Sequence, residues 1–143
     1  MTEYPYYSKR IWLPDKIKNF RSFAKLQEYP EKTVLFSQGE ASDRVYFIEE
    51  GTVSLYHLSD EGKAITVMIH NKGDIVGHAC VLNSPVREVS CETVSTCRIW
   101  EFPRNDFLKM MENYPEVAIW AAYDLATRIR IIGNNVRRLV GLT

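Results

Sequence analysis

The sequence has few of the residues that mark disulfide-bonded, metal-binding or membrane proteins. Its 143 residues include three cysteines, Cys80, Cys91 and Cys97. They form no Cys-x-x-Cys pair, so we expect three free thiols in a reducing compartment. No apolar run approaches the roughly 20 residues that span a bilayer, and the first twelve residues lack the apolar core of a signal peptide. We therefore expect a cytoplasmic protein that does not contact a membrane.

An excess of charge of one sign is also missing. Eighteen basic residues balance eighteen acidic residues, so the chain as a whole has no electrostatic basis for binding nucleic acid. The three histidines, His57, His70 and His78, are isolated, and no nucleophile and base stand at a catalytic spacing. The sequence thus predicts no catalytic residue, no metal site and no enzyme activity. The length and a 45% hydrophobic, 25% charged composition fit one globular domain with a substantial core.

Short apolar strands separated by turns fill the middle of the chain. Residues 53–58 alternate with period two, a Ser-Asp-Glu-Gly turn follows, and residues 64–70 return as the hairpin partner with Ile65, Val67 and Ile69 on one face. Further strands are expected at 33–36, 45–48, 88–94 and 98–102. Many short strands with glycine at most turns predict a jelly-roll-like antiparallel barrel. Before them we expect a tyrosine-rich arm over residues 1–12 and a short helix from Pro14 through Leu26.

The C-terminal part is predicted to be helical. After Pro103, either Asn105 or Asp106 can cap a short helix that runs through residue 112. Asn113 can cap a final helix that runs to about residue 142, and Pro115 is tolerated in its first turn. We therefore divide the chain into an arm with a short helix (1–27), a β-roll (28–112) and a long helix (113–143).

Apolar residues recur along the long helix in steps of four and three. This spacing is typical of a coiled-coil seam of about three heptads, so we expect the helix to pair with its copy in a homodimer. A second apolar set, Val117, Trp120 and Ile131, remains to face the barrel. The alternative is that the helix lies on its own barrel. The predicted dimer seam consists of Ala118, Ala122, Leu125, Ile129, Ile132, Val136 and Leu139.

The stretch 73–88, GDIVGHACVLNSPVRE, is the candidate ligand site. Gly77 permits a close backbone approach because it has no Cβ, and successive free N–H groups in such a turn form an anion-binding concavity. Arg87 can complete this concavity with a fork of donors. The alternatives are an ordinary turn at Gly77 and a salt bridge from Arg87 to Glu88 or another acid. The predicted ligand-binding residues here are Gly77, His78, Ala79, Cys80, Arg87 and Glu88.

Several of these segments resemble the sensor half of Crp/Fnr-type bacterial transcription regulators. The matching pieces are LFSQGE at 35–40, YFIEEGTV at 46–53, DEGK at 60–63 and Gly73-Asp74, and the resemblance covers about residues 20–142. It implies a double-stranded β-helix of the cyclic-nucleotide-binding-domain type, followed by a long dimerisation helix. In that family a C-terminal helix-turn-helix domain reads DNA. The sequence stops at Thr143, where that domain would begin, so we expect a fragment that does not read DNA by itself.

The chain departs from the family pattern at two ligand positions. In the nucleotide-binding members of the family that this chain resembles, the site reads roughly Phe-Gly-Glu, followed by Arg-Ser or Arg-Thr. In this chain His78 stands in place of the Glu, and Glu88 stands in place of the Ser. A carboxylate about 4 Å from a phosphate costs on the order of 4 kcal/mol at an effective dielectric constant near 20. We therefore expect a small effector other than cyclic AMP, such as an organic acid paired with Arg87. Ordinary cyclic AMP binding stays open if Glu88 turns away or Ser84 stands in for it.

A haem or redox sensor of the same fold is the other alternative. His78 and Cys80 lie close together in the sequence, and histidine and thiolate both ligate haem iron. A His-x-Cys pair is a weak signal, so haem is not the expected cofactor. Three scattered cysteines also do not supply the four thiolates of an iron–sulfur cluster.

The resemblance further implies how a signal would travel. Ligand binding near residues 77–87 would reposition the start of the long helix near 118–125 in both subunits. This requires that the ligand prefer one of two states. Thr127 or Arg128 from the partner's helix would then supply a polar contact to the ligand.

Overall fold

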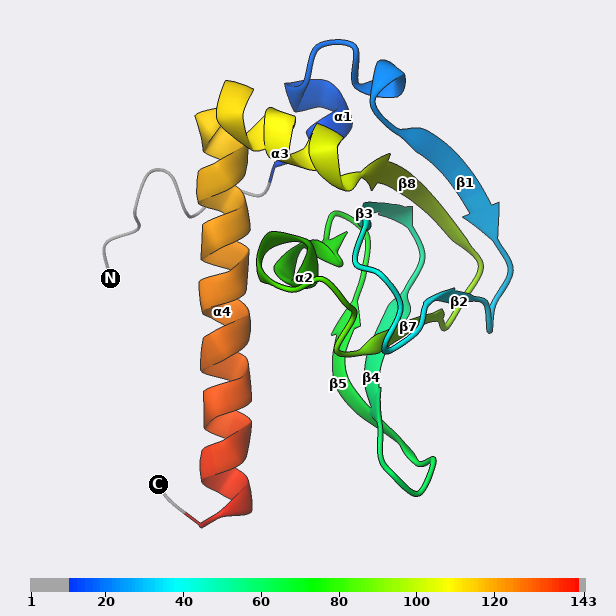
Figure 1. Cartoon of the computed structure of the whole chain (residues 1–143), viewed down its shortest axis with the longest axis vertical. Helices are drawn as coiled ribbons and strands as arrows, with labels where there is room; N and C mark the ends of the chain where they lie inside the picture. The colour runs from blue at the N-terminus through cyan, green and yellow to red at the C-terminus, as the bar shows by residue number, and fades with distance from the viewer. Residues whose placement is uncertain (1–10, 142–143) are drawn as a thin grey trace.

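The computed structural model describes residues 11–141, and its strands form two antiparallel four-stranded sheets. One sheet has the order β1-β8-β3-β6 and the other the order β2-β7-β4-β5. Together they form the β-roll, and the predicted double-stranded β-helix is confirmed (Figure 1). The strands are β1 (Lys25–Tyr29), β2 (Val34–Phe36), β3 (Arg44–Glu50), β4 (Val53–Leu58), β5 (Ala64–His70), β6 (Ile75–Val76), β7 (Ser90–Thr93) and β8 (Cys97–Pro103).

Within residues 11–141, four α-helices and one 3-10 helix lie along one side and at one end of the roll (Figure 1). In Figure 1 the long helix α4 stands along one side of it, and α2 lies between α4 and the strands. No helix of the described residues is both long and apolar enough to cross a bilayer. All three cysteines are free thiols, as predicted. The helices are α1 (Leu13–Lys16), η1 (Phe20–Ser22), α2 (His78–Asn83), α3 (Arg104–Asn113) and α4 (Pro115–Leu139).

Strand β3 separates two apolar clusters. Side chains alternate across a strand, so Val45 and Phe47 pack into a cluster under the helices, while Tyr46 and Ile48 pack between the two sheets. The first cluster includes Val117, Trp120 and Ala121 of α4. The beginning of α4 is therefore anchored to the roll.

The predicted helix from Pro14 through Leu26 is wrong. Helix α1 ends at Lys16, and Asn19 adopts a left-handed conformation with φ of 59°, which interrupts a continuous helix. The chain then enters β1, whose residues 25–29 pair with residues 97–101 of β8. The pairing partner lies far along the sequence, so tertiary pairing rather than local pattern determines this strand. Most of the predicted N-terminal arm lies outside the described residues.

Both C-terminal helices form, but their caps differ from those predicted. Neither helix has a side-chain cap. Helix α3 begins directly after Pro103, so Asn105 and Asp106 lie inside it, and Asn113 is the last residue of α3 rather than the cap of α4. Pro115 occupies the first turn of α4, as expected for a residue without an N–H donor. Val117 and Trp120 face the roll, whereas Ile131 is exposed, so its predicted place against the barrel is wrong. Helix α4 ends at Leu139, about three residues before the predicted end near residue 142.

Candidate functional site

Gly77 forms a turn that no other residue type would fit without strain. It lies between β6 and α2 and has φ of +87°, in the left-handed region that favours glycine. A Cβ at this position would lie 2.9 Å from Nη1 of Arg87 and 3.3 Å from the carbonyl oxygen of Arg44. The predicted close approach is confirmed, and the approaching group is the guanidinium of Arg87.

Arg87 is buried, with 2% of its surface exposed. Its Nη1 donates to the Gly77 carbonyl oxygen at 2.7 Å, and its Nη2 donates to the Arg44 carbonyl oxygen. The guanidinium carbon also lies 4.1 Å from the centre of the Phe36 ring, and burial lowers the pKa of the group. Within residues 11–141 no carboxylate forms an ion pair with Arg87, so backbone carbonyls replace the salt bridge to Glu88 that the sequence left open.

Arg87 lines a cavity of about 290 Å³ together with two acidic side chains, Glu40 and Asp43, and a second basic one, Arg44. Tyr46 also lines this cavity, and burial raises the pKa of its hydroxyl to about 12, so the phenol stays protonated at neutral pH. The two carboxylates offset the two arginines of the lining, so the cavity has little net positive charge to attract an anion.

His78 joins the turn after β6 to α4 through a buried polar network. Its ring is fully buried, and Nε2 lies 2.9 Å from Oδ2 of Asp124 on α4. The same Oδ2 lies 2.9 Å from Nε of Arg128, whose Nη2 donates to the Ile75 carbonyl oxygen. The Asp124–Arg128 contact is an ion pair by distance, whereas His78 is neutral at neutral pH because its pKa is lowered, and neither contact has well-aligned hydrogen-bond geometry. Burial lowers the pKa of His78, and the Asp124 carboxylate opposes that shift.

This polar network links α4 to the β6–α2 segment, in addition to the apolar contacts that anchor the beginning of α4. Asp124 and Arg128 are four residues apart and therefore lie on one face of the helix. Arg128 was predicted as a site residue, and Asp124 was missed. The i, i+4 spacing of Asp and Arg was visible in the sequence, but the burial of His78 opposite them was not.

A second cavity, of about 470 Å³, lies between the roll, α2 and α4. Of the predicted ligand-binding residues, it brings together Ala79, Cys80, Glu88 and Arg128. Gly77, His78, Arg87 and Thr127 do not line it. We call it the interelement cavity, and its walls are Leu55, Val67, Met68, Ala79, Cys80, Leu82, Asn83, Glu88, Val89, Leu125, Arg128, Ile129 and Ile132.

The remaining predicted polar contacts are engaged elsewhere. The Thr127 hydroxyl donates to the Tyr123 carbonyl oxygen one turn earlier in α4, at 2.9 Å. The Ser84 hydroxyl donates to the Val86 carbonyl oxygen at 2.8 Å, so it holds the turn after α2 instead of facing the cavity. Cys80 lines the interelement cavity, and His78 does not. Among residues 11–141 no group of three His, Cys, Asp or Glu side chains is placed to hold a metal ion.

The predicted seam residues divide into two groups along α4. Ala118 and Leu125 are half-buried near the roll and Ala122 between them is exposed, whereas all the later seam residues are exposed, with Ile129 at 71% and Leu139 at 86%. Leu125, Ile129 and Ile132 also line the interelement cavity. One helix face is thus shared by the cavity and by the predicted seam.

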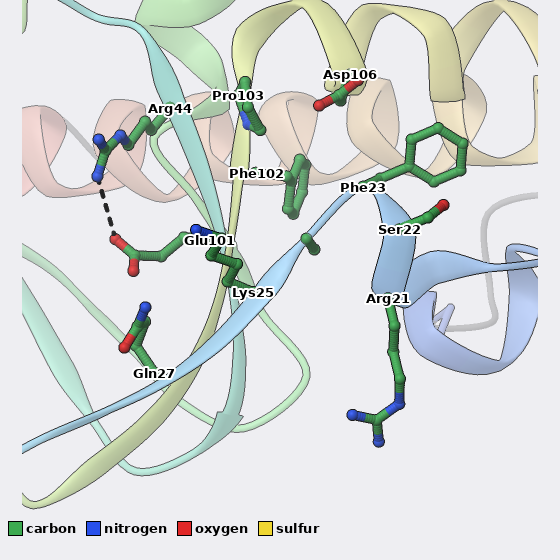
Figure 2. A pocket seen from close by; sticks show the side chains of 11 residues that line it. Arg21, Ser22, Phe23, Lys25, Gln27, Arg44, Glu101, Phe102, Pro103 and Asp106 are labelled. Atoms are coloured by element: carbon green, nitrogen blue, oxygen red, sulfur yellow. Dashed lines mark ion pairs between the residues drawn. The ribbon is translucent and has the colours of Figure 1, made fainter.

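A third cavity, of about 440 Å³, lies between η1, β1, β8 and the start of α3 (Figure 2). Its walls mix basic side chains from Arg21, Lys25 and Arg44 with acidic ones from Glu101 and Asp106. The close-up shows Arg44 and Glu101 pointing toward each other, with 3.8 Å between Nη1 and Oε1. No residue of α2 or α4 lines this cavity, so a ligand there would not touch the long helix.

Comparisons with known proteins identify relatives of the chain. A family model described as a cyclic nucleotide-binding domain matches residues 26–114. The cAMP-activated global transcriptional regulator CRP of Salmonella typhimurium is 24% identical over 124 residues. This match covers 86% of the chain and 59% of the relative, so the chain spans less than two thirds of that protein's length.

Solved structures share the fold. The c-di-GMP-responsive global regulator CLP of Xanthomonas campestris matches with a TM-score of 0.78 at 21% identity, over 87% of this chain and 63% of that one. The catabolite activator protein of Thermus thermophilus matches with a TM-score of 0.77 at 23% identity, over 96% of this chain and 63% of that one. These two likenesses extend beyond the roll into the long helix, because the coverage exceeds the span of the family model.

Proposed function

The chain belongs to the cyclic nucleotide-binding domain family, in the form found in Crp/Fnr-type transcription regulators, and from this premise we propose that it is an effector sensor. The interelement cavity carries the proposal. Its walls come from the β4–β5 hairpin, from α2 and from α4. A molecule that fills it touches the roll and the long helix together, and its binding free energy can therefore depend on how α4 is placed.

The proposed output is a change in α4 within a homodimer. Exposed apolar residues that recur in steps of three and four on a 25-residue helix are typical of a helix that pairs with another. Ile129, Ile132, Val136 and Leu139 form this exposed stripe. A second copy of the same helix supplies the matching stripe, so the occupant we propose is the α4 of a partner subunit.

DNA reading would belong to a part of a longer regulator that this sequence does not include. The matched relative is a transcription regulator, and 59% of its length is covered. Within a dimer, a movement of two α4 helices would change the spacing of whatever each helix carries. Half-site spacing is what dimeric DNA readers recognise. The chain itself is neutral, which supports sensing rather than DNA contact as its own role.

Sedimentation equilibrium and a thermal-shift screen of metabolites on the purified chain test this function. We expect a dimer at micromolar concentration, and at least one compound that raises the Tm of the wild type but not of an Ala79→Phe variant. Ala79 lines the interelement cavity, so a phenyl ring there fills the space. A chain that stays monomeric, together with compounds that stabilise both proteins equally, would contradict the proposal.

A further inference from the structure

The chemistry of the interelement cavity indicates which class of effector it takes. We propose that this cavity binds a mainly apolar molecule without negative charge, and not a cyclic nucleotide. The inference rests on the proposed sensor function and specifies its ligand. Most of the wall is aliphatic, and its polar side chains come from Cys80, Asn83, Glu88 and Arg128.

The arginine that would hold a phosphate is turned away from this cavity. Arg87 does not line it, and both terminal nitrogens of its guanidinium already donate to buried backbone carbonyls, those of Gly77 and Arg44. Its Nε is buried without a hydrogen-bond partner, but an anion in the interelement cavity would reach that donor only if the Arg87 side chain moved, and such a movement would break the two bonds and leave buried acceptors unpaired. Arg87 therefore stabilises the Gly77 turn by linking its carbonyl oxygen to that of Arg44.

The second arginine is neutralised. Arg128 lines the cavity, but its Nε lies 2.9 Å from the Asp124 carboxylate and its Nη2 donates to the Ile75 carbonyl oxygen. Its positive charge is compensated inside its own helix by a residue that does not line the cavity. It contributes the aliphatic part of its side chain to the wall and little net charge to a ligand.

Glu88 then sets the sign of the cavity. It lines the wall, it is exposed, and among residues 11–141 it forms no ion pair. Because Arg128 of the same wall is paired with Asp124, the Glu88 carboxylate leaves the cavity with a solvent-screened negative charge that disfavours an anionic ligand and tolerates a neutral or cationic one. The cavity volume of about 470 Å³ lies in the range that holds drug-sized molecules. A neutral apolar ligand satisfies the size, the lining and the charge together.

Two fluorescent probes that share one ring system test the inference directly. N-phenyl-1-naphthylamine is uncharged, and 8-anilinonaphthalene-1-sulfonate is its sulfonated, anionic counterpart. Titrating both into the wild-type chain, we expect micromolar binding of the neutral probe and at least about tenfold weaker binding of the sulfonate. Equal binding of the two probes, or tighter binding of the sulfonate, would overturn the assignment without any variant.

Matched variants locate the probe and the charge. Ala79→Phe fills the cavity and is expected to weaken the neutral probe about tenfold or more, whereas Ala64→Phe, on the outer face of the β4–β5 hairpin, leaves it unchanged. Glu88→Gln is expected to bring the sulfonate within about threefold of the neutral probe, whereas Glu92→Gln, outside the cavity, does not. An Ala79→Phe variant that binds the neutral probe like the wild type would show that the probe sits elsewhere and would overturn the inference.

Calorimetry with cyclic AMP separates the failure of this inference from failure of the sensor function. We expect no binding at micromolar concentration. Micromolar binding that is lost in Arg87→Met would refute the ligand class and leave the sensor function standing. A chain that binds neither the two probes nor cyclic AMP would refute the ligand class, and the oligomeric state and the metabolite screen would decide the sensor function separately.

Discussion

Removing the Asp124 carboxylate tests whether the buried network holds α4 to the roll. Asp124→Asn keeps the size of the side chain and removes the charge that lies 2.9 Å from both His78 Nε2 and Arg128 Nε. Removing one partner of a buried ion pair costs about 3–5 kcal/mol. Because the Asp124 side chain is 22% exposed, solvent screens part of this, and we expect a loss of about 2–3 kcal/mol in the free energy of unfolding.

Urea unfolding followed by circular dichroism measures this loss. For a domain of this size the loss corresponds to a fall in Tm of about 6–9 °C. Glu116→Gln is the matched control. Glu116 also lies on α4, 3.8 Å from Lys16 of α1, and its side chain is 39% exposed, so we expect a change below about 0.5 kcal/mol. A double-mutant cycle with Arg128→Met is expected to give a coupling energy of about 1–3 kcal/mol. If Asp124→Asn costs no more than the control, the network does not hold the helix and the reasoning is refuted.

Three further predictions concern pH, the tight turn and the exposed stripe. The pKa of His78 is lowered in the folded state, so below pH 6.5 the unfolded chain binds a proton that the folded chain does not. As the pH is lowered, the free energy of unfolding therefore falls by up to about 1.4 kcal/mol per pH unit. Denaturant titrations should show that His78→Gln makes this fall shallower and that His57→Gln, at an exposed position, leaves it intact. Gly77→Ala and Gly62→Ala both place an alanine in a left-handed backbone conformation, but only the first places a Cβ 2.9 Å from a guanidinium nitrogen. Thermal unfolding should therefore show that the free energy of unfolding falls by at least about 1 kcal/mol more for the change at position 77. Equal losses would contradict the close approach. Ile129→Glu is expected to weaken self-association at least about a hundredfold by placing a charge in the seam, and a dimer of unchanged affinity in sedimentation equilibrium would exclude that seam.

The strand pattern of the sequence was sufficient to predict most of the roll. Strands β4 and β5 match the predicted ranges 53–58 and 64–70 because side-chain alternation and a glycine turn act locally. Strand β1 was missed because its sequence, KLQEY, has no apolar alternation and is a strand only through its pairing with β8. Local pattern predicts elements whose stability is local, and it fails for an element that depends on a distant partner.

The sequence predicted the segment that contains the candidate site, but not the contacts that its side chains make. Gly77 and Arg87 were placed together correctly, but which acceptors the guanidinium uses depends on the Arg44 carbonyl, which belongs to a distant strand. The network of His78, Asp124 and Arg128 likewise requires that α4 cross α2 at one register. Such contacts follow from tertiary packing, and a single sequence carries no direct signal for them.

The central claim is that the roll and the long helix share one cavity. Hydrogen exchange of the chain with and without saturating N-phenyl-1-naphthylamine tests this claim most directly. The account predicts slower exchange in β5 and in residues 125–132 of α4 at the same probe concentration, because Val67, Met68, Leu125 and Ile132 line that cavity. It also predicts no change in β1 or η1, which border the separate cavity of Figure 2. Protection of the roll alone, with α4 exchanging as in the free chain, would contradict the account.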